Sequence, residues 1–297
     1  MSKTIVITGC SSGFGRLAAV KLAQGGNRVY ATMRDIGGRN SEKAEELRSI
    51  SKEQGLDIRP LELDVTSTDS VNAAAHQVDE ESGSADVVIN NAGQMYVGIT
   101  ECFDEHELAR QLDINVVGVH RMNRAFLPAM RASGTGLVIN ISSVAGRISI
   151  PFFGVYHASK WALEGYCQSL RYELASSGVD VVVIEPGPFS TALFGTSPAP
   201  ADKDGRTSTY IPSVPQSLAD MSEAFGQMFD NDEVPTDPMI VVDRMVELVE
   251  MQSGTRPFRS VCGVDFDVRG MNATCEPYYD GVISAMGMED FATLKAK

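Results

Sequence analysis

Cysteine and histidine are scarce in this chain, and their spacing excludes several classes of site. The five cysteines are an odd number and form no Cys-x-x-Cys motif, so the sequence predicts neither a disulfide framework nor a zinc site. The four histidines form no His-x-x-x-His pair, and we therefore expect no metal site. These features are typical of a protein from a reducing cytoplasm. In that compartment the sequon Asn272-Ala-Thr274 is expected to be a chance match.

Long apolar runs and an excess of positive charge are also missing. No run reaches the roughly 18 apolar residues that a membrane-spanning helix needs. A strand-like run begins at Thr4, which leaves no room for a signal peptide. The net charge is −14, from 25 Lys and Arg against 39 Asp and Glu. We therefore expect neither nucleic acid nor a membrane as a partner, because both are anionic.

Apolar strand-like runs alternate with helical patterns over the first 185 residues. Asp86–Ile89 and Asp180–Ile184 are nearly all apolar, which indicates parallel strands buried on both faces. The alternation predicts an α/β fold, a doubly wound Rossmann-type sheet flanked by helices, in a single domain over residues 1–297. The expected strands are Thr4–Thr8, Arg28–Met33, Ile58–Leu63, Asp86–Asn90, Gly136–Ile141, Asp180–Ile184 and Arg259–Val264. The expected helices are Gly13–Gln24, Ser41–Gln54, Ser67–Glu81, Asp104–Ala132, Val155–Ser176 and Met239–Met251.

The composition of the sequence changes after Pro186. Eight prolines occur between Pro186 and Pro238, with Ser and Thr between them and no strand pattern. A plain loop of that length is unusual inside a compact domain, so we expect short helices or a function there. We interpret residues 188–238 as an insertion that covers the substrate, with a flexible surface excursion as the alternative.

A glycine-rich turn follows the first expected strand and precedes the first expected helix. Gly9, Gly13 and Gly15 let the backbone turn tightly and approach a ligand closely. The N-terminus of the following helix offers free N–H groups and the positive end of its dipole to a phosphate. A glycine pattern between an N-terminal strand and a helix therefore predicts a dinucleotide site.

The end of the second strand indicates which dinucleotide is bound. An acidic residue there suits the 2′-hydroxyl of NAD, and a basic residue suits the 2′-phosphate of NADP. Met33 stands at the usual acidic position and Arg34 follows it, with Ser12 able to add a hydroxyl, so the sequence favours NADP(H). If the strand runs further, Asp35 takes the acidic role and NAD(H) is the cofactor. Arg34 and Asp35 also fit a simple turn.

Polar residues follow three further strands, where the carboxyl ends of a parallel sheet face the ligand crevice. Asp64 and Val65 follow the third strand, and Asn90-Asn-Ala-Gly93 closes the fourth. Asn115 interrupts a helical pattern, either as a satisfied core amide or as a polar group facing a site. Ser142-Ser143 follows the fifth strand, where a helix or turn cap is the alternative to a catalytic role.

Tyr156 and Lys160 lie one helical turn apart, on one face of an expected helix. A nearby ammonium favours the tyrosinate and lowers the phenol pKa from its usual value of about 10. Such a phenol can give or take a proton near neutral pH. The spacing alone also fits a surface helix with a solvated lysine. The motifs that precede it in the sequence favour the proton-transfer interpretation.

Together these residues resemble the short-chain dehydrogenase/reductase family. The matching motifs lie in order over residues 4–191, and Ser143 stands thirteen residues before Tyr156, as is usual in that family. The runs Tyr30–Asp35 and Tyr156–Gly165 look most like the hydroxysteroid and retinol dehydrogenase branch. The motifs are Thr8-Gly-x-x-x-Gly-x-Gly15, Asn90-Asn-Ala-Gly93, Asn115, Ser143, Tyr156-x-x-x-Lys160 and Pro186-Gly187-x-x-x-Thr191.

The resemblance implies a seven-stranded parallel sheet in the order 3-2-1-4-5-6-7. It implies that Tyr156 is the general acid in reduction and the base in oxidation, and that Lys160 lowers its pKa and holds the nicotinamide ribose. Ser143 would bind the substrate oxygen, and Asn115 would help to hold a proton-relaying water chain. With Arg34 from the strand-end argument, the expected cofactor-binding residues are Gly9, Ser11, Ser12, Gly13, Phe14, Gly15, Arg34, Asp64, Val65, Asn91, Ala92, Gly93, Tyr156, Lys160, Pro186, Gly187, Phe189 and Thr191.

The sequence thus predicts an NADP(H)-dependent oxidoreductase that interconverts a carbonyl and an alcohol on a small hydrophobic substrate. Two alternatives stay open: an NAD(H)-dependent alcohol or hydroxysteroid dehydrogenase working oxidatively, and a non-catalytic dinucleotide-sensing protein of the same fold. The resemblance also implies a homodimer or homotetramer, built on Asp104–Ala132 and Val155–Ser176. We expect His157 to be an exposed helix residue, with a place in the substrate pocket or in the dimer face as alternatives.

Overall fold

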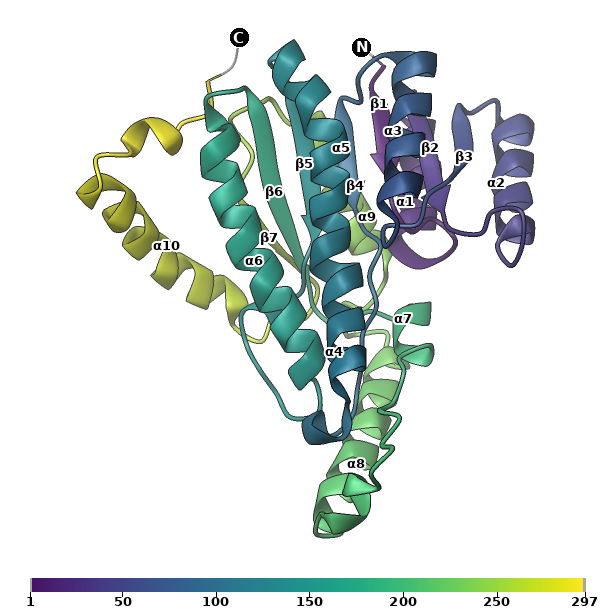
Figure 1. Ribbon diagram of the computed structural model, residues 1–297, viewed down its shortest axis with the longest axis vertical. Helices are drawn as coiled ribbons and strands as arrows, with labels where there is room; N and C mark the ends of the chain where they lie inside the picture. The colour runs from purple at the N-terminus through teal and green to yellow at the C-terminus, as the bar shows by residue number, and fades with distance from the viewer. Residues whose placement is uncertain (1, 296–297) are drawn as a thin grey trace.

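A sheet of seven parallel strands forms the centre of the protein (Figure 1). The structure is a computed structural model that describes residues 2–295. The strands lie in the order β3-β2-β1-β4-β5-β6-β7, and every neighbouring pair is parallel. This arrangement confirms the predicted fold class and strand order. The strands are β1 (Thr4–Ile7), β2 (Arg28–Met33), β3 (Ile58–Glu62), β4 (Val87–Asn90), β5 (Gly136–Ile141), β6 (Val179–Pro186) and β7 (Arg259–Cys262).

Two hydrophobic cores cover the two faces of this sheet. Successive side chains of a strand point to opposite faces, so Ile5 and Ile7 belong to one core and Val6 to the other. Because both faces are buried, the inner strand β6 carries the apolar run Val181–Ile184, whereas the edge strand β3 carries the polar residues Arg59 and Glu62. The first core is closed by α1 (Gly13–Gln24), α2 (Ser41–Gln54) and α9 (Met239–Glu250). The second, in front of the sheet in Figure 1, is closed by α3 (Thr68–Ser82), α5 (Gly118–Ser133) and α6 (Gly154–Ala175).

The predicted helix Asp104–Ala132 is two helices joined by a π-helical turn. α4 (Glu105–Leu112) begins at a capping box, in which the Asp104 carboxylate accepts from the Glu107 N–H at 2.9 Å and the Glu107 carboxylate accepts from the Asp104 N–H at 2.9 Å. The turn Asp113–Val117 then leads into α5. The π turn continues the chain from α4 into α5 with one extra residue, where the sequence predicted a single helix.

The proline-rich segment after β6 contains three helical pieces. Two of them are single turns, α7 (Ala192–Gly195) and a 3₁₀ turn at Arg206–Thr209, and they agree with the prediction of short helices in this segment. α8 (Ser213–Phe229) is longer than we expected, at 17 residues. Its prolines stand at the N-cap and in the first turn, where a missing N–H costs little. α8 projects past the carboxyl edge of the sheet, at the bottom of Figure 1.

A further long helix, α10 (Val268–Ala285), is absent from the sequence prediction. Pro277 lies inside it, and a proline in a helical pattern normally marks the end of a helix. α10 lies apart from the sheet, beyond α6 in Figure 1, and buries only Val268 and Asn272. The remaining 3₁₀ turns are Thr100–Cys102, Val144–Gly146 and Glu289–Phe291. None of the helices in residues 2–295 has the length and apolar content to cross a bilayer.

Candidate active site

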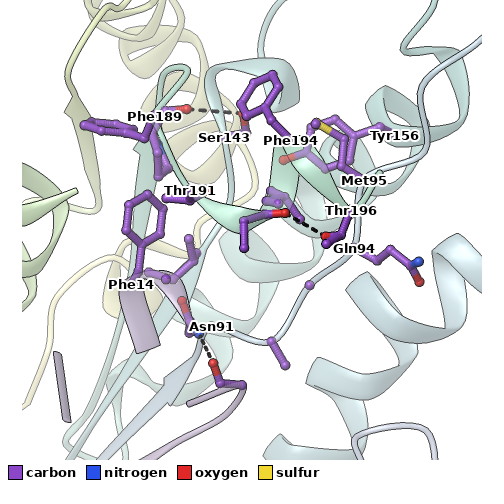
Figure 2. A pocket seen from close by; sticks show the side chains of 18 of the residues that line it. Phe14, Asn91, Gln94, Met95, Ser143, Tyr156, Phe189, Thr191, Phe194 and Thr196 are labelled. Atoms are coloured by element: carbon purple, nitrogen blue, oxygen red, sulfur yellow. Dashed lines mark hydrogen bonds between the residues drawn. The ribbon is translucent and has the colours of Figure 1, made fainter. Parts of the chain in front are cut away.

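One cavity of about 980 Å³ lies at the carboxyl edge of the sheet. The segments that follow β1, β2, β3, β4, β5 and β6 all contribute to its lining, together with α7 and α8. Figure 2 shows Phe14, Phe189 and Thr191 on one side of this cavity, and Tyr156, Met95 and Phe194 gathered on the other. Parallel strands bring their polar end segments to one edge, which explains why residues far apart in sequence meet here.

The glycine-rich turn forms the wall between β1 and α1. Gly9 has φ +74°, and a Cβ there would lie 2.9 Å from the Ala92 Cα, so only glycine fits this approach of two strand ends. The Asn91 side chain fixes the same contact, because its Nδ2 donates to the Thr8 carbonyl at 2.8 Å and to the Gly9 carbonyl at 3.2 Å. Ser12 is the N-cap of α1, and its side chain makes no capping hydrogen bond among the described residues. The first-turn N–H groups of α1 are therefore available to an anion.

Gly15 is one of two predicted site residues that do not line the cavity. A Cβ at Gly15 would lie 2.5 Å from both the Asn91 Nδ2 and the Gly9 carbonyl oxygen. The absence of a side chain at Gly15 therefore allows α1 to pack closely against the Gly9 turn and against Asn91.

Two arginines line the far end of the cavity. Arg34 follows β2, as expected, and Arg39 joins it from the turn before α2. Arg34 is exposed, but partial desolvation beside the cavity lowers the pKa of its guanidinium, and the positive charge of Arg39 lowers it further. Asp64 lines the same end; burial raises its pKa, but hydrogen bonds from Thr66 and the charge of Arg34 outweigh this and hold it below its ordinary value.

Asp35 is turned away from the cavity. β2 ends at Met33, and Asp35 has φ +52° in the turn that follows. Its carboxylate accepts from the Arg39 N–H at 3.1 Å, and its own N–H donates to the Glu62 carboxylate at 2.8 Å. Asp35 does not appear in the cavity lining. Its carboxylate stabilises the turn that presents Arg39.

Tyr156, Lys160 and Ser143 meet in the middle of the cavity. Tyr156 and Lys160 project from the first turns of α6, and the Lys160 Nζ lies 5.7 Å from the centre of the Tyr156 ring. The Lys160 ammonium donates to the Ile141 carbonyl at the end of β5, at 2.7 Å. The Ser143 hydroxyl donates to the Pro186 carbonyl at 3.2 Å, which ties the end of β5 to the end of β6 (Figure 2).

Burial dominates the proton affinities of this group. It raises the pKa of Tyr156 to about 12, although a hydrogen bond with Ser143 acts in the opposite direction. It also lowers the pKa of Lys160 to about 8, although the nearby Glu164 charge raises it. The prediction of a lowered Tyr156 pKa is therefore wrong for this structure. The lysine faces a backbone carbonyl and the tyrosine ring, and desolvation of the phenolate is the larger effect.

Asn115 lies in the π turn and does not line the cavity. Its Oδ1 accepts from the Gln94 N–H, and its Nδ2 donates to the Gln94 carbonyl, both at 2.9 Å. The Nδ2 also donates to the Ser159 hydroxyl at 3.0 Å. The Asn115 amide thus holds the loop after β4 against α6, and the extra residue of the π turn brings it there.

Aromatic and methionine side chains line the end of the cavity next to Tyr156. Phe153 packs edge to face against both Tyr156 and Phe225, with ring centres 6.5 and 6.2 Å apart. Phe194 of α7 contacts Phe225 and Phe229 of α8. The insertion 188–238 therefore closes this end with apolar surface. The predicted cofactor residue Phe189 lines the cavity and also packs against Phe14, with ring centres 5.5 Å apart, as part of the first core.

His157 is buried and lines the cavity, so the prediction of an exposed residue is wrong. Its Nε2 accepts from the Ile150 N–H at 2.9 Å, and its Nδ1 faces the Ala145 carbonyl at 2.8 Å. A neutral ring with the proton on Nδ1 satisfies both partners. His157 therefore fixes the loop that follows Ser143. Of the alternatives that the sequence left open for His157, a place in the cavity lining is the one that the structure shows.

Sequence reasoning missed most of the apolar lining and one charged residue. Arg39 had a signal, because it is a second basic residue shortly after β2. Leu193, Phe194, Met221 and Met228 lie in the insertion that the sequence predicted to cover the substrate, so their segment was identified although their place in the lining was not. The other missed lining residues include Arg39, Asn40, Thr66, Gln94, Met95, Ile148, Ile150, Phe153 and Phe266. Within residues 2–295, no three His, Cys, Asp or Glu side chains are grouped as metal ligands would be.

Many known proteins have sequences and folds similar to those of this chain. The family model for short chain dehydrogenase matches residues 3–201. A 3-ketodihydrosphingosine reductase from Bacteroides thetaiotaomicron is 39% identical over 72% of this chain and 74% of its own length. Human 17-beta-hydroxysteroid dehydrogenase type 1 is 45% identical over 65% of this chain, which spans 59% of that relative. Human retinol dehydrogenase 16 is 36% identical over 76% of this chain and 67% of its own length.

A solved structure extends the match to the whole fold. The crystal structure of a short-chain dehydrogenase from Streptomyces avermitilis superposes with a TM-score of 0.74, at 30% identity, over 97% of this chain and 99% of the other. The family interconverts alcohols and carbonyls with a nicotinamide cofactor. This chain belongs to the short-chain dehydrogenase/reductase family, within its hydroxysteroid and retinol dehydrogenase branch.

Proposed function

We propose that this oxidoreductase uses NADP(H) to interconvert a carbonyl and an alcohol on a hydrophobic substrate. One observation carries the proposal: a single cavity is lined at one end by Arg34 and Arg39, in the middle by Ser143 and Tyr156, and at the other end by aromatic side chains. Such a cavity would hold a dinucleotide and an apolar molecule side by side, with Tyr156 placed to exchange a proton with that molecule.

The residues present fit a nicotinamide dinucleotide. The N–H groups of the first turn of α1, beside the close approach at Gly9, would hold the pyrophosphate. Asp64 would contact the adenosine, and Lys160 the nicotinamide ribose. Residues 186–191 would contact the carboxamide and the phosphate. When bound, the cofactor supplies or accepts the hydride, and the protein orients it.

Arginine geometry supports NADP(H) over NAD(H). A guanidinium binds phosphate oxygens in pairs, and Arg34 and Arg39 both line the end of the cavity where the adenosine would lie. The acidic residue that would favour NAD(H), Asp35, is engaged by the Arg39 N–H outside the cavity. We infer a preference for NADP(H), and with it reduction as the working direction, because cellular NADP pools are usually reduced.

Three side chains of this chain would carry out the proton chemistry. Tyr156, with a pKa of about 12, is protonated at neutral pH and can donate to the oxygen of a carbonyl. The Lys160 ammonium beside its ring stabilises the phenolate left behind. The Ser143 hydroxyl lies next to Tyr156 and can donate to the same substrate oxygen as negative charge develops there. Asn115 holds the neighbouring loop in place through Gln94.

The substrate end supports a hydrophobic molecule. Met95 and Phe153 are buried beside Tyr156, and Phe194, Met221 and Phe225 pack on them from the insertion 188–238. We propose this insertion as the cover of the substrate. The names of two relatives, a ketodihydrosphingosine reductase and a hydroxysteroid dehydrogenase, favour the same chemical class. We also propose a homodimer or homotetramer through α5 and α6, where Trp161 is 42% exposed.

Replacement of Tyr156 by Phe tests the mechanism. We expect Tyr156→Phe to lower the rate of NADPH oxidation by about 10²- to 10⁴-fold, because the general acid is removed. The assay would use a panel of hydrophobic aldehydes, ketones, quinones and steroids, and NADPH binding should stay as in the wild type. Tyr166→Phe is the matched control, since Tyr166 lies on the same helix outside the cavity lining. Turnover that survives Tyr156→Phe contradicts the mechanism and supports a different proton donor.

A further inference from the structure

Asn272 is the one polar side chain that α10 buries, and the sequence drew attention to it only as a sequon. The helix has 18 residues and just two buried positions, Val268 and Asn272, which are one turn apart. Asn272 is 6% exposed. An amide at one of two buried positions is unusual unless both of its ends are hydrogen-bonded, because burial of an unpaired amide is costly.

Both ends of the Asn272 amide meet buried charges. Its Oδ1 accepts from the Arg147 Nε at 2.8 Å, and its Nδ2 donates to the Glu185 Oε2 at 2.6 Å. The flipped amide would place its NH₂ group against a guanidinium and its oxygen against a carboxylate. The two charges therefore fix the orientation of the amide. The Nδ2 is engaged in the folded chain, so it is not available for glycosylation.

The two charged partners adjoin the two segments that carry the predicted chemistry. Arg147 follows Ser143 by four residues, across the 3₁₀ turn Val144–Gly146. Glu185 directly precedes Pro186, whose carbonyl accepts from the Ser143 hydroxyl. The Asn272 amide thus bridges, from behind, the same two strand ends that the Ser143 hydroxyl bridges within the cavity.

Two arginines and two carboxyl groups surround the Asn272 amide. Arg259 of β7 lies between two carboxylates, with its Nε 3.0 Å from the Glu164 Oε2 and 3.5 Å from the Glu185 Oε1. The Tyr279 hydroxyl of α10 accepts from the Arg147 guanidinium at 3.5 Å. Arg147 and Arg259 thus face the carboxyl groups of Glu164 and Glu185 in a space where all four side chains are buried, and burial together with the Glu164 charge raises the pKa of Glu185. Among residues 2–295, Asn272 donates the one hydrogen bond that the Glu185 carboxylate accepts.

We propose that Asn272 is a positioning residue for the reaction: its amide holds the Ser143 loop and the Pro186 loop at a fixed separation through Arg147 and Glu185. The proposal rests on the proposed function, because it assigns the work of those loops to hydride and proton transfer. It makes α10, a helix outside the sheet, part of the apparatus that aligns the reacting groups. A displacement of about 1 Å in such groups lowers turnover by about 10²-fold.

Two isosteric substitutions test this assignment. Asn272→Leu removes both hydrogen bonds. Asn272→Asp keeps the acceptor for Arg147 but places a second carboxyl group against Glu185. That pair is compatible only while it holds a proton, so the variant should fail as the pH rises. Burial and the Glu164 charge already raise the pKa of Glu185 to about 8, against the effect of Arg259, Asn272 and Arg147. Thr274→Ala is the matched control, since Thr274 is exposed on the same helix.

The assay measures kcat and KM for NADPH oxidation with phenanthrenequinone as the carbonyl probe, below the unfolding temperature of each variant. We expect Asn272→Leu to lose about tenfold or more in kcat while its dissociation constant for NADPH changes less than about threefold. We expect the ratio of kcat for Asn272→Asp to that of the wild type to fall about tenfold between about pH 6 and about pH 9. A purely structural role would lower thermal stability without moving either quantity.

Two results overturn the proposal. One is a kcat for Asn272→Leu within about twofold of the wild type; the other is an Asn272→Asp profile parallel to that of the wild type over the same pH range. Failure of the proposed function is a separate outcome, because it would appear as turnover that survives Tyr156→Phe. If Tyr156→Phe is inactive and both Asn272 variants behave as the wild type, only the positioning role is wrong.

Discussion

Replacement of Gly9 by alanine should damage the protein in two separable ways. Gly9 has φ +74°, in the left-handed region, where an alanine costs about 1–2 kcal/mol. The new Cβ would also lie 2.9 Å from the Ala92 Cα and 3.2 Å from the Ala92 Cβ. The Ala92 backbone cannot move away freely, because its N–H donates to the Thr8 hydroxyl at 2.9 Å. Overpacking of this kind adds about 1–3 kcal/mol.

The expected loss in unfolding free energy is therefore about 2–5 kcal/mol for Gly9→Ala. Gly55 provides the matched control, because it has φ +65° at the end of α2 and no described atom within 4 Å of a Cβ built there. Gly55→Ala should lose only the conformational part, about 1–2 kcal/mol. The difference between the two variants isolates the contact with Ala92.

Urea denaturation of both variants measures this difference, and titration with NADPH measures its effect on the proposed dinucleotide site. We expect Gly9→Ala to bind NADPH at least about tenfold more weakly, since relief of the clash displaces the turn that lines the cavity. Gly55→Ala should bind as the wild type does. Equal loss of stability in the two variants would refute the steric argument. Normal NADPH affinity in a destabilised Gly9→Ala would refute the placement of the pyrophosphate at this turn.

Two further predictions concern charge. Arg34→Ala and Arg39→Ala should each weaken NADPH binding about tenfold and leave NADH binding unchanged. A charge-assisted hydrogen bond is worth about 1.5–3 kcal/mol, and the lower part of that range applies because both arginines are exposed. Arg48→Ala, outside the cavity, is the control, and equal weakening of both dinucleotides would contradict an NADP(H) site. Carbonyl reduction should fall as the pH rises through about 8, where the Lys160 ammonium loses its proton. Glu164→Gln should move that fall to lower pH, since the Glu164 charge raises the Lys160 pKa, and an unmoved profile of kcat against pH would count against Lys160 as the group that titrates.

The parts of the protein that the sequence predicted are those encoded locally. Apolar runs such as Asp180–Ile184 identify strands buried on both faces, and Gly9 marks a turn that no other residue fits. The Tyr156 and Lys160 spacing survives in the structure because both residues lie on one regular helix. Each of these signals depends on neighbours in the chain, so it can be read before the fold is known.

The parts that were missed depend on contacts between distant segments. Asn115 was identified in the sequence, but its hydrogen bonds to Gln94 and Ser159 depend on the π turn, which the sequence did not reveal. The Tyr156 pKa depends on burial, which the spacing to Lys160 does not reveal. His157 and Asn272 have ordinary surface-helix surroundings in sequence, and each is buried by segments that arrive from elsewhere in the fold. In all four cases, the environment of the side chain is set by tertiary packing and not by the residues next to it in the sequence.

The end of the cavity that we propose for the substrate is attached differently from the rest. The glycine turn and Tyr156 belong to segments joined directly to the buried sheet, whereas neither α7 nor α8 has a fully buried residue. α8 is held to the body mainly by partly buried apolar side chains, such as Met221 and Phe225. A segment with few buried contacts opens at lower free energy than the sheet does. Changes in α7 and α8 can therefore alter which molecule reaches Tyr156 at little cost to the fold, because Ser143 and Lys160 take their positions from the end of β5 and from α6.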